Sequence, residues 1–296
     1  MPRLAEQSTG PEQLGQILHD AARRLEPDQW IQSLSPRKRE EVEFHNRSRD
    51  PAAQLPERLA SWEREHGNKR FYDTTAASWE YTRRWIEANA PGAVLLDYAC
   101  GEGIGACHAA AAGATLAIGI DISPVAIANS TRVAAERGLT DRTRFLVGDC
   151  EHTALPDASI DRVVCLGCLH HLDLSYALPE LRRILKPGGT VLALEALNYN
   201  PLIRLYRRLT PHLRTEWERR HILSHRELRF ARYFFEVREV RYFHLTSILT
   251  TPLRRTRLFG PALALANRVD GVLCRVPGVS LMSWMFAFEL VNRDEG

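Results

Sequence analysis

The residues of greatest chemical interest stand in one short stretch, Val94 to Gly105, with the sequence VLLDYACGEGIG. An apolar run leads into Asp97, and glycines then alternate with other residues from Gly101 onward. Glycines at a turn from a strand into a helix let the backbone approach a ligand closely, and the N-terminus of that helix offers free N–H groups to a carboxylate or phosphate. The stretch therefore predicts a site for a nucleotide-like cofactor.

Acidic side chains at the ends of three predicted strands narrow the choice of cofactor. Asp97 would repel the pyrophosphate of NAD but suits a ligand that carries ammonium and sulfonium charges. Asp121 stands where a carboxylate can accept hydrogen bonds from both ribose hydroxyls, which alone would fit NAD equally well. Asp149 is placed to accept a hydrogen bond from an adenine amino group. Together the three acids favour S-adenosylmethionine over a dinucleotide.

Two adjacent histidines, His170 and His171, follow the fourth predicted strand at the same edge. A histidine with a pKa of ~6.5 can take a proton from a hydroxyl group at neutral pH, and His171 is the first candidate for such a base. The alternative is that the pair stacks on the cofactor or caps the next helix, with Asp173 as a local partner. Glu195 ends the fifth strand, where it would orient the acceptor, hold the histidine or pair with an arginine.

The elements that must position these residues are short apolar runs that alternate with helical stretches. This alternation predicts an α/β fold with a mostly parallel, doubly wound sheet. Ligands of such sheets bind at the C-terminal ends of the strands, where the acids and histidines stand. The predicted strands are 94–98, 115–120, 144–147, 160–166 and 190–197, and the helices between them are 104–112, 124–137 and 176–185.

Further segments carry a family resemblance: GID at 119–121, GDC at 148–150, ALP at 154–156, LHH at 169–171 and LKPGG at 185–189. In this order they resemble the class I S-adenosylmethionine-dependent methyltransferases, above all the small-molecule branch with the ubiquinone and menaquinone methyltransferases and the sugar O-methyltransferases. The resemblance covers residues 70 to 197 well and the rest loosely. It implies a Rossmann-like sheet with an antiparallel C-terminal strand, and S-adenosyl-L-homocysteine as the product of the cofactor.

The resemblance also implies roles for single residues. Ala99 departs from the glycine usual in the family, which narrows the turn without abolishing it. A paired histidine is similar to that of sugar O-methyltransferases, in which it is proposed as the base, although many relatives carry the pair without an established role. The implied cofactor-binding residues are Asp97, Gly101 and Gly103 at the methionine part, Asp121 at the ribose, Asp149 and Cys150 at the adenine, Leu166 and Gly167 at the methionine amine, and also Ala99 and Ile122.

Five regions are expected along the chain. The resemblance places a substrate lid after the fifth strand, and its arginines and aromatic residues suit a carboxylate, phosphate or anionic sugar. The alternative for the lid is a solvated amphipathic helix with Leu202, Leu205 and Leu209 on its buried side. The candidate substrate-binding residues are Tyr72, Tyr81, Tyr206, Arg207, His212 and Arg214. The regions are a helical arm (1–39), a helical cap (40–90), the cofactor-binding core (91–197), the lid (198–223) and the C-terminal completion of the sheet (224–296).

An apolar helix is expected at 261–273, before a final strand at 282–291. Basic residues precede the helix, and it could lie on a membrane surface if the acceptor were a quinone or lipid. The default expectation is burial against the sheet or in a homodimer interface. The partners expected are therefore a small-molecule acceptor, anionic or lipid-like, with a peripheral membrane contact and a homodimer both left open.

The composition argues against nucleic-acid binding, secretion and a metal site. A net charge of +3 without a basic arm argues against nucleic acid. The cysteines stand mostly in apolar runs and the N-terminus lacks a secretory pattern, which favours a reducing cytoplasm. Cys165 and Cys168 form a C-x-x-C without a second pair at zinc-finger spacing, so they are expected to be core thiols, and no metal site is predicted.

The sequence thus predicts an S-adenosylmethionine-dependent methyltransferase that acts on a small molecule, with oxygen as the methylated atom and a histidine base. Three alternatives stay open. They are C-methylation of a quinone or isoprenoid-like acceptor at a membrane surface, a catalytically silent S-adenosylmethionine-binding module, and a nicotinamide-dependent oxidoreductase.

Overall fold

The computed structural model describes residues 10–22, 26–49 and 67–293. Parts of the predicted helical arm, 1–9 and 23–25, and the middle of the predicted cap, 50–66, therefore lie outside the described residues. Within the described part of the chain, no helix is long and apolar enough to cross a bilayer.

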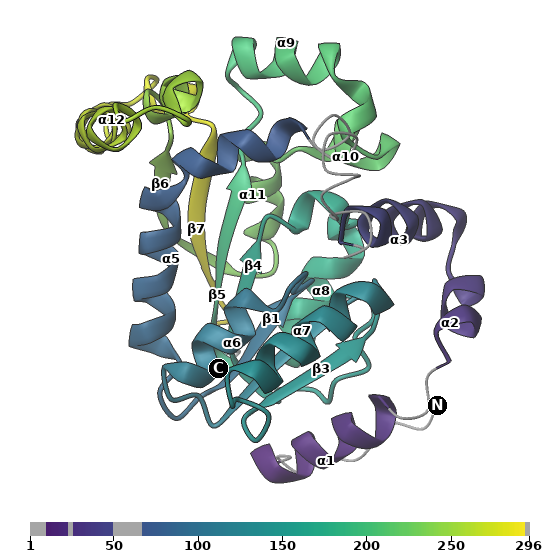
Figure 1. The fold of residues 1–296 in the computed structure, drawn as a ribbon. Coiled ribbons are helices and arrows are strands. Elements are labelled where there is room, and N and C mark those ends of the chain that lie inside the picture. The colour runs from purple at the N-terminus through teal and green to yellow at the C-terminus, as the bar shows by residue number, and fades with distance from the viewer. Residues whose placement is uncertain (1–9, 23–25, 50–66, 294–296) are drawn as a thin grey trace.

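Seven strands form one sheet in the order β3-β2-β1-β4-β5-β7-β6 (Figure 1). The first five run parallel, and β7 is antiparallel to both β5 and β6. This confirms the predicted doubly wound sheet with an antiparallel C-terminal strand. The strands are β1 (Val94–Tyr98), β2 (Leu116–Asp121), β3 (Thr143–Val147), β4 (Ile160–Leu166), β5 (Leu185–Ala196), β6 (Glu236–Phe243) and β7 (Met285–Val291).

Strands β1 and β2 are buried at every position because helices cover both faces of the sheet. Leu95 faces a core shared with α5 and α6, whereas Leu96 faces a core shared with α1, α8 and α11. Cys165 and Cys168 are free thiols in the same core as Leu96, as the sequence predicts. Side-chain alternation along a strand thus divides the apolar runs between two layers of helices.

The helices are α1 (Pro11–Ala22), α2 (Pro27–Ser33), α3 (Pro36–Arg49), α5 (Ala76–Asn89), α6 (Ile104–Ala111), α7 (Pro124–Glu136), α8 (Leu174–Ile184), α9 (Pro201–Leu209), α10 (Glu216–His221), α11 (His225–Ala231) and α12 (Phe259–Leu273). Short 3-10 helices lie between them. These are η2 (Gly67–Thr74), η3 (Leu169–His171), η4 (Pro211–Leu213), η5 (Ser247–Leu253) and η6 (Ser280–Met282).

The strand order reverses between β1 and β4, and this reversal places a crevice at the carboxyl ends of the parallel strands. Helix α3 lies beside this edge (Figure 1) and is joined to the start of α7 by a hydrogen bond of 2.5 Å between Asn46 and Ser123. The predicted boundary between arm and cap, at residue 39, falls inside α3. The arm is therefore a part of the site.

The structure differs from what was expected for the C-terminal helix and for the lid. Helix α12 is not buried against the sheet, since Asp270 is its single buried residue, and its burial in a homodimer interface stays a prediction. The leucines of α9 do not face the protein either, because Leu202, Leu205 and Leu209 are 72%, 52% and 71% exposed. The amphipathic pattern identified the helices, but a pattern does not say whether the apolar side is turned inward.

Candidate functional site

The carboxyl ends of β1, β2, β3 and β4 open into a cavity of about 460 Å³. This volume lies within the range of about 300 to 1,000 Å³ that is typical of pockets for small ligands. Nine of the predicted cofactor-binding residues line the cavity, together with His170, His171 and Tyr72. The nine are Asp97, Ala99, Gly101, Asp121, Ile122, Asp149, Cys150, Leu166 and Gly167.

The glycine turn between β1 and α6 adopts a left-handed backbone. Gly101 has φ of 53° and Gly103 has φ of 70°, and Ala99 also adopts a positive φ of 52°. Gly103 does not line the cavity, and a Cβ atom on it would lie 2.7 Å from the ring of Phe145. The structure therefore requires glycine at this position for packing of the turn against β3, whether or not a ligand is bound.

Asp97 is almost fully buried below the start of α6, where one carboxylate oxygen accepts the N–H of Ala106 at 2.9 Å. Burial raises the pKa of Asp97 to about 7, the charge of Asp121 adds to this rise, and the N–H groups of Ala106 and Gly105 partly oppose it. A cation bound beside this group would favour its ionised form. The site therefore fits a ligand with a positive charge at this end.

The other two strand-end acids already have partners in the protein. Asp121 accepts the backbone N–H groups of Gly101 at 2.8 Å and of Ser123 at 2.9 Å. Asp149 accepts the N–H of Glu151 at 2.9 Å and a hydrogen bond from the ammonium group of Lys38. Ribose or adenine would therefore share these carboxylates with the glycine turn and with α3.

Helix α3 supplies one side of the cavity, which the sequence interpretation missed. Lys38, Glu41, His45 and Arg49 follow one another at intervals of three or four residues, so they lie on one face of the helix, and all four line the cavity. Lys38 also pairs with Glu151 at 2.7 Å. The spacing is visible in the sequence, but nothing in the sequence shows which face of the helix meets the sheet.

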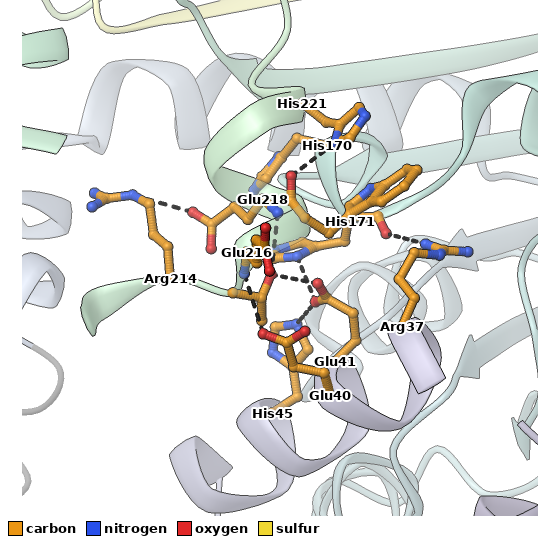
Figure 2. A network of polar contacts seen from close by, with 12 residues as sticks. Arg37, Glu40, Glu41, His45, His170, His171, Arg214, Glu216, Glu218 and His221 are labelled. Carbon is orange, nitrogen blue, oxygen red and sulfur yellow. Dashed lines mark hydrogen bonds and ion pairs between the residues drawn. The ribbon is translucent and has the colours of Figure 1, made fainter. Parts of the chain in front are cut away.

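Glu41 of α3 and His171 of η3 form a hydrogen-bonded pair, and both residues line the cavity (Figure 2). Nδ1 of His171 lies 2.9 Å from the Glu41 carboxylate, which also accepts the hydroxyl of Thr215 and lies 3.5 Å from Nε2 of His45. Nε2 of His171 has no hydrogen-bonding partner among the described residues. The ring is thus oriented by one nitrogen while the other is available to a ligand.

The charges of this cluster are set by burial and by the pairing. Burial alone would lower the pKa of His171, but the hydrogen bond to Glu41 and the charge of Glu218 raise it above its usual value. The hydrogen bonds from His171 and His45 hold the pKa of Glu41 far below its usual value against the opposite effect of burial. Burial lowers the pKa of His45 to about 4, so this imidazole is neutral at pH 7.

His170 is held differently. Its Nδ1 lies 2.7 Å from Glu195, and the same carboxylate accepts the backbone N–H groups of Cys168 and Leu169 at 2.8 and 2.7 Å. Glu195 is fully buried and does not line the cavity. Of the roles considered for Glu195, the geometry fits the one in which it holds a histidine and the turn around it.

Most of the predicted substrate-binding residues lie away from the cavity. Tyr72 lines it, together with Leu213 and Glu218 of the lid. Arg207 donates to the carbonyl of Leu197. Arg214 pairs with Glu218, Tyr206 packs on Phe71, Tyr81 packs on Phe243, and His212 is exposed.

Comparison with known proteins agrees with this geometry. Residues 96–193 match a family described as "Methyltransferase domain". This part of the chain is therefore similar to methyltransferase domains. The match covers β2, β3 and β4 and most of β1 and β5, and it includes the glycine turn, the three strand-end acids Asp97, Asp121 and Asp149, and both histidines.

Two curated relatives share this domain. The chain is 35% identical over 96 residues to 27-O-demethylrifamycin SV methyltransferase of Amycolatopsis mediterranei, which is 32% of this chain and 35% of that protein. It is 33% identical over 101 residues to ajmaline N-methyltransferase of Rauvolfia serpentina, which is 34% of this chain and 35% of that protein. The chain thus spans about a third of the length of these relatives.

A solved structure is similar over most of the chain. Geranyl diphosphate C-methyltransferase from Streptomyces coelicolor, in complex with Mg²⁺, geranyl diphosphate and S-adenosyl-L-homocysteine, covers 88% of this chain and 99% of its own, with a TM-score of 0.58 and 16% identity. At this identity the likeness shows the fold alone. The fold extends beyond residues 96–193 to the N-terminal and C-terminal elements.

Proposed function

We propose that the chain transfers the methyl group of S-adenosylmethionine to an oxygen atom of a small molecule, with His171 as the base. The observation that carries the proposal is the Glu41–His171 pair in the wall of the cavity. A carboxylate on Nδ1 fixes the tautomer that leaves Nε2 as a proton acceptor, which is the arrangement general-base catalysis needs.

The residues present fit the proposed cofactor. The left-handed turn at Gly101 and the start of α6 would hold the methionine part, with Asp97 beside its positive charges. Asp121 would accept the ribose hydroxyls, while Asp149 and Cys150 would contact the adenine. When bound, the cofactor would supply a methyl group bonded to a positively charged sulfur. An acceptor atom in line with that bond would attack the methyl carbon, and the sulfur would leave as S-adenosylhomocysteine.

The protein's own part in the reaction is to bind, align and deprotonate the acceptor. An acceptor hydroxyl within hydrogen-bond reach of Nε2 of His171 would transfer its proton to the ring as the oxygen attacks. The imidazolium formed in this way is stabilised by Glu41, whose charge is maintained by Thr215 and His45. The lid residues Leu213 and Glu218 close the same side of the cavity and help to exclude water.

A second candidate is C-methylation of an apolar acceptor. Phe44, Trp79, Ile104 and Leu172 line the cavity, so an isoprenoid or quinone ring would be buried among apolar side chains. Carbon attack from an alkene needs no base before the methyl transfer. This reaction would therefore depend less on the Glu41–His171 pair.

Calorimetric titration with S-adenosylhomocysteine and with NAD tests the proposed cofactor. We expect saturable binding of S-adenosylhomocysteine and none of NAD, and binding of NAD alone would refute the assignment. Incubation with methyl-labelled S-adenosylmethionine and fractionated metabolites of the host then tests turnover. Tight binding without label transfer to any fraction would favour a silent binding module.

Glu41, His45 and His171 are also residue types that can hold a divalent metal ion, and their ligand atoms lie within 4.8 Å of one another. The proposed base requires Nδ1 of His171 to be protonated instead. We therefore expect label transfer to survive a chelator, and loss of transfer with recovery on added metal would contradict the proposed role of His171.

A further inference from the structure

Two exposed helices in this fold carry apolar residues toward solvent. In α9 the leucines at 202, 205 and 209 recur at intervals of three and four residues, so they form one stripe on the helix. They are 72%, 52% and 71% exposed, whereas Ile203 and Tyr206 face the protein. The most apolar stripe of the helix is therefore its outer side.

Helix α12 repeats this arrangement. Leu258, Leu265, Val269 and Val272 are spaced by seven, four and three residues and lie on one face. They are 64%, 63%, 39% and 67% exposed. The opposite side is fixed by Asp270, whose carboxylate accepts the N–H of Thr246 at 2.6 Å and of Ser247 at 3.1 Å. A buried acid thus anchors the helix with its apolar face outward.

Both segments are strongly basic, with several arginines and almost no acidic residues. Helix α9 contains three arginines and no acid. Residues 247–282, which include α12, contain five arginines, no lysine and a single acid, the buried Asp270. Arg204, Arg208 and Arg268 are exposed next to the apolar stripes. An outer surface of leucine, valine and arginine, with no exposed acid in the two helices, matches an anionic apolar boundary.

Both helices lie at the edge of the sheet where the cavity opens. Helix α9 follows the carboxyl end of β5, and η5 and α12 follow the carboxyl end of β6, which points the same way because both strands are antiparallel to β7. Figure 1 shows both helices beyond the carboxyl ends of these strands, α9 at the top and α12 at the upper left. A hydrogen bond of 2.6 Å from Asn200 to the carbonyl of Met282 ties the start of α9 to the segment after α12.

We propose that the outer faces of α9 and α12 form a docking surface for an anionic lipid bilayer. Neither helix crosses the bilayer; their leucines and valines enter the boundary between headgroups and acyl chains, and the arginines pair with anionic headgroups. A second copy of the chain fits less well, because a twofold interface would place the arginines of the two copies against each other. Docking would turn the cavity edge toward amphiphilic acceptors.

Vesicle co-sedimentation tests this surface without requiring turnover, so its outcome is separate from that of the proposed reaction. The chain is mixed with vesicles of phosphatidylcholine alone or with added phosphatidylglycerol. We expect binding to the anionic vesicles that weakens at high salt, and much weaker binding to the neutral ones. Equal binding to both kinds, or binding to neither, would overturn the proposal.

Three variants locate the contact. Replacing Leu202, Leu209, Leu265 and Val272 together by glutamine should lower the partition coefficient by about tenfold or more, and Arg204→Gln with Arg208→Gln by about tenfold. The matched control is Tyr233→Gln, since Tyr233 is 80% exposed at the opposite edge of the sheet and should have no effect. Retained binding of S-adenosylhomocysteine shows that each variant is folded.

Light scattering on the same samples tests whether a second copy of the chain occupies this surface instead. A monomer in every variant agrees with the lipid surface. A wild-type dimer that becomes a monomer in the leucine and valine variant, together with unchanged vesicle binding, would assign the surface to self-association and refute the proposal.

Discussion

His170 and His171 are neighbours in the chain, and each binds a carboxylate through Nδ1, yet the two pairs lie in different surroundings. Glu195 is fully buried and also holds two backbone N–H groups of the same turn. Glu41 comes from a separate helix, lies in the cavity wall and holds no backbone group of that turn. Similar pairs can therefore serve a scaffold or a reaction, and the surroundings decide which.

The largest expected effect separates the two histidines by rate. His171→Ala should lower kcat by about 10²- to 10⁴-fold, because it removes the proposed base. Binding of S-adenosylhomocysteine and the unfolding transition should stay close to those of the wild type. His221→Ala is a matched control, since His221 is an exposed histidine at the end of α10. A rate within a few-fold of the wild type would favour carbon methylation.

The second effect separates the two carboxylates by stability. Glu195→Leu removes the acceptor of two buried N–H groups and of His170, so it should lower the free energy of unfolding by about 3 kcal/mol or more. Glu41→Gln should lower it by about 1 kcal/mol, since Glu41 is nearer to the cavity and holds only side chains. Urea unfolding measures both. Equal losses would show that the two pairs do not differ in the way described.

The third effect concerns the pH dependence of the rate. A base must be neutral, so kcat/KM should rise with pH through the pKa of His171, which the Glu41 carboxylate raises above its usual value. Glu41→Gln removes that negative charge, so the rising limb should move to lower pH by about one unit while the plateau falls. A lower plateau with an unmoved limb would indicate that Glu41 has only a structural role.

The fourth effect tests the cofactor end of the cavity. With a pKa of about 7, Asp97 is partly protonated in the ligand-free protein at neutral pH. The ammonium group of S-adenosylhomocysteine should favour ionised Asp97, so its affinity should increase as pH rises from about 6 to about 8, with proton release on binding. In Asp97→Asn this pH dependence should be lost, and if it persists another group is responsible.

The raised pKa of Asp97 also makes the stability of the ligand-free protein depend on pH. Stability should fall as the pH rises, whereas the affinity for the cofactor should increase. The pKa of Asp97 is raised in the folded protein, so the folded state binds a proton more tightly than the unfolded chain. This contribution to stability is complete below a pH of about 4 and is lost as the pH rises through about 7. The free energy of unfolding of the ligand-free protein is measured across this pH window. In Asp97→Asn its dependence on pH should be weaker.

The smallest effect is expected at the glycine turn. Ala99 has φ of 52°, which strains a residue with a Cβ atom. Ala99→Gly should therefore stabilise the protein by about 1 kcal/mol without changing cofactor affinity by more than a few-fold. Gly101→Ala is the opposite change at a neighbouring left-handed position and should destabilise. A loss of stability in Ala99→Gly would mean that the turn is not strained there.

The sequence predicts the sheet well, and it predicts the site residues that stand at the ends of the strands. Both rest on local signals, namely the periodicity of apolar residues and the acids at the strand ends. The apolar runs at β1 and β2 identify buried strands, and the acids after them reach the cavity because parallel strands end at one edge. Gly103 carries a strong signal as well, but the structure explains it by contact with Phe145.

The rest of the site depends on long-range packing. Glu41 lies 130 residues before His171 in the chain, and only docking of α3 on the sheet brings the two together. The arginines of the lid suit an anion by type, but Arg207 is directed to a backbone carbonyl of its own segment. The same limit applies to α9 and α12, whose apolar stripes are recognisable although their outward direction is not.

The most direct test of the account is to identify the atom that receives the methyl group. The chain is incubated with S-adenosylmethionine labelled with carbon-13 at the methyl group and with the acceptor fraction, and the product is analysed by NMR. We expect a labelled methyl group bonded to oxygen, formed by the wild type and by His221→Ala but not by His171→Ala. A labelled methyl group bonded to carbon, formed equally well by His171→Ala, would contradict it.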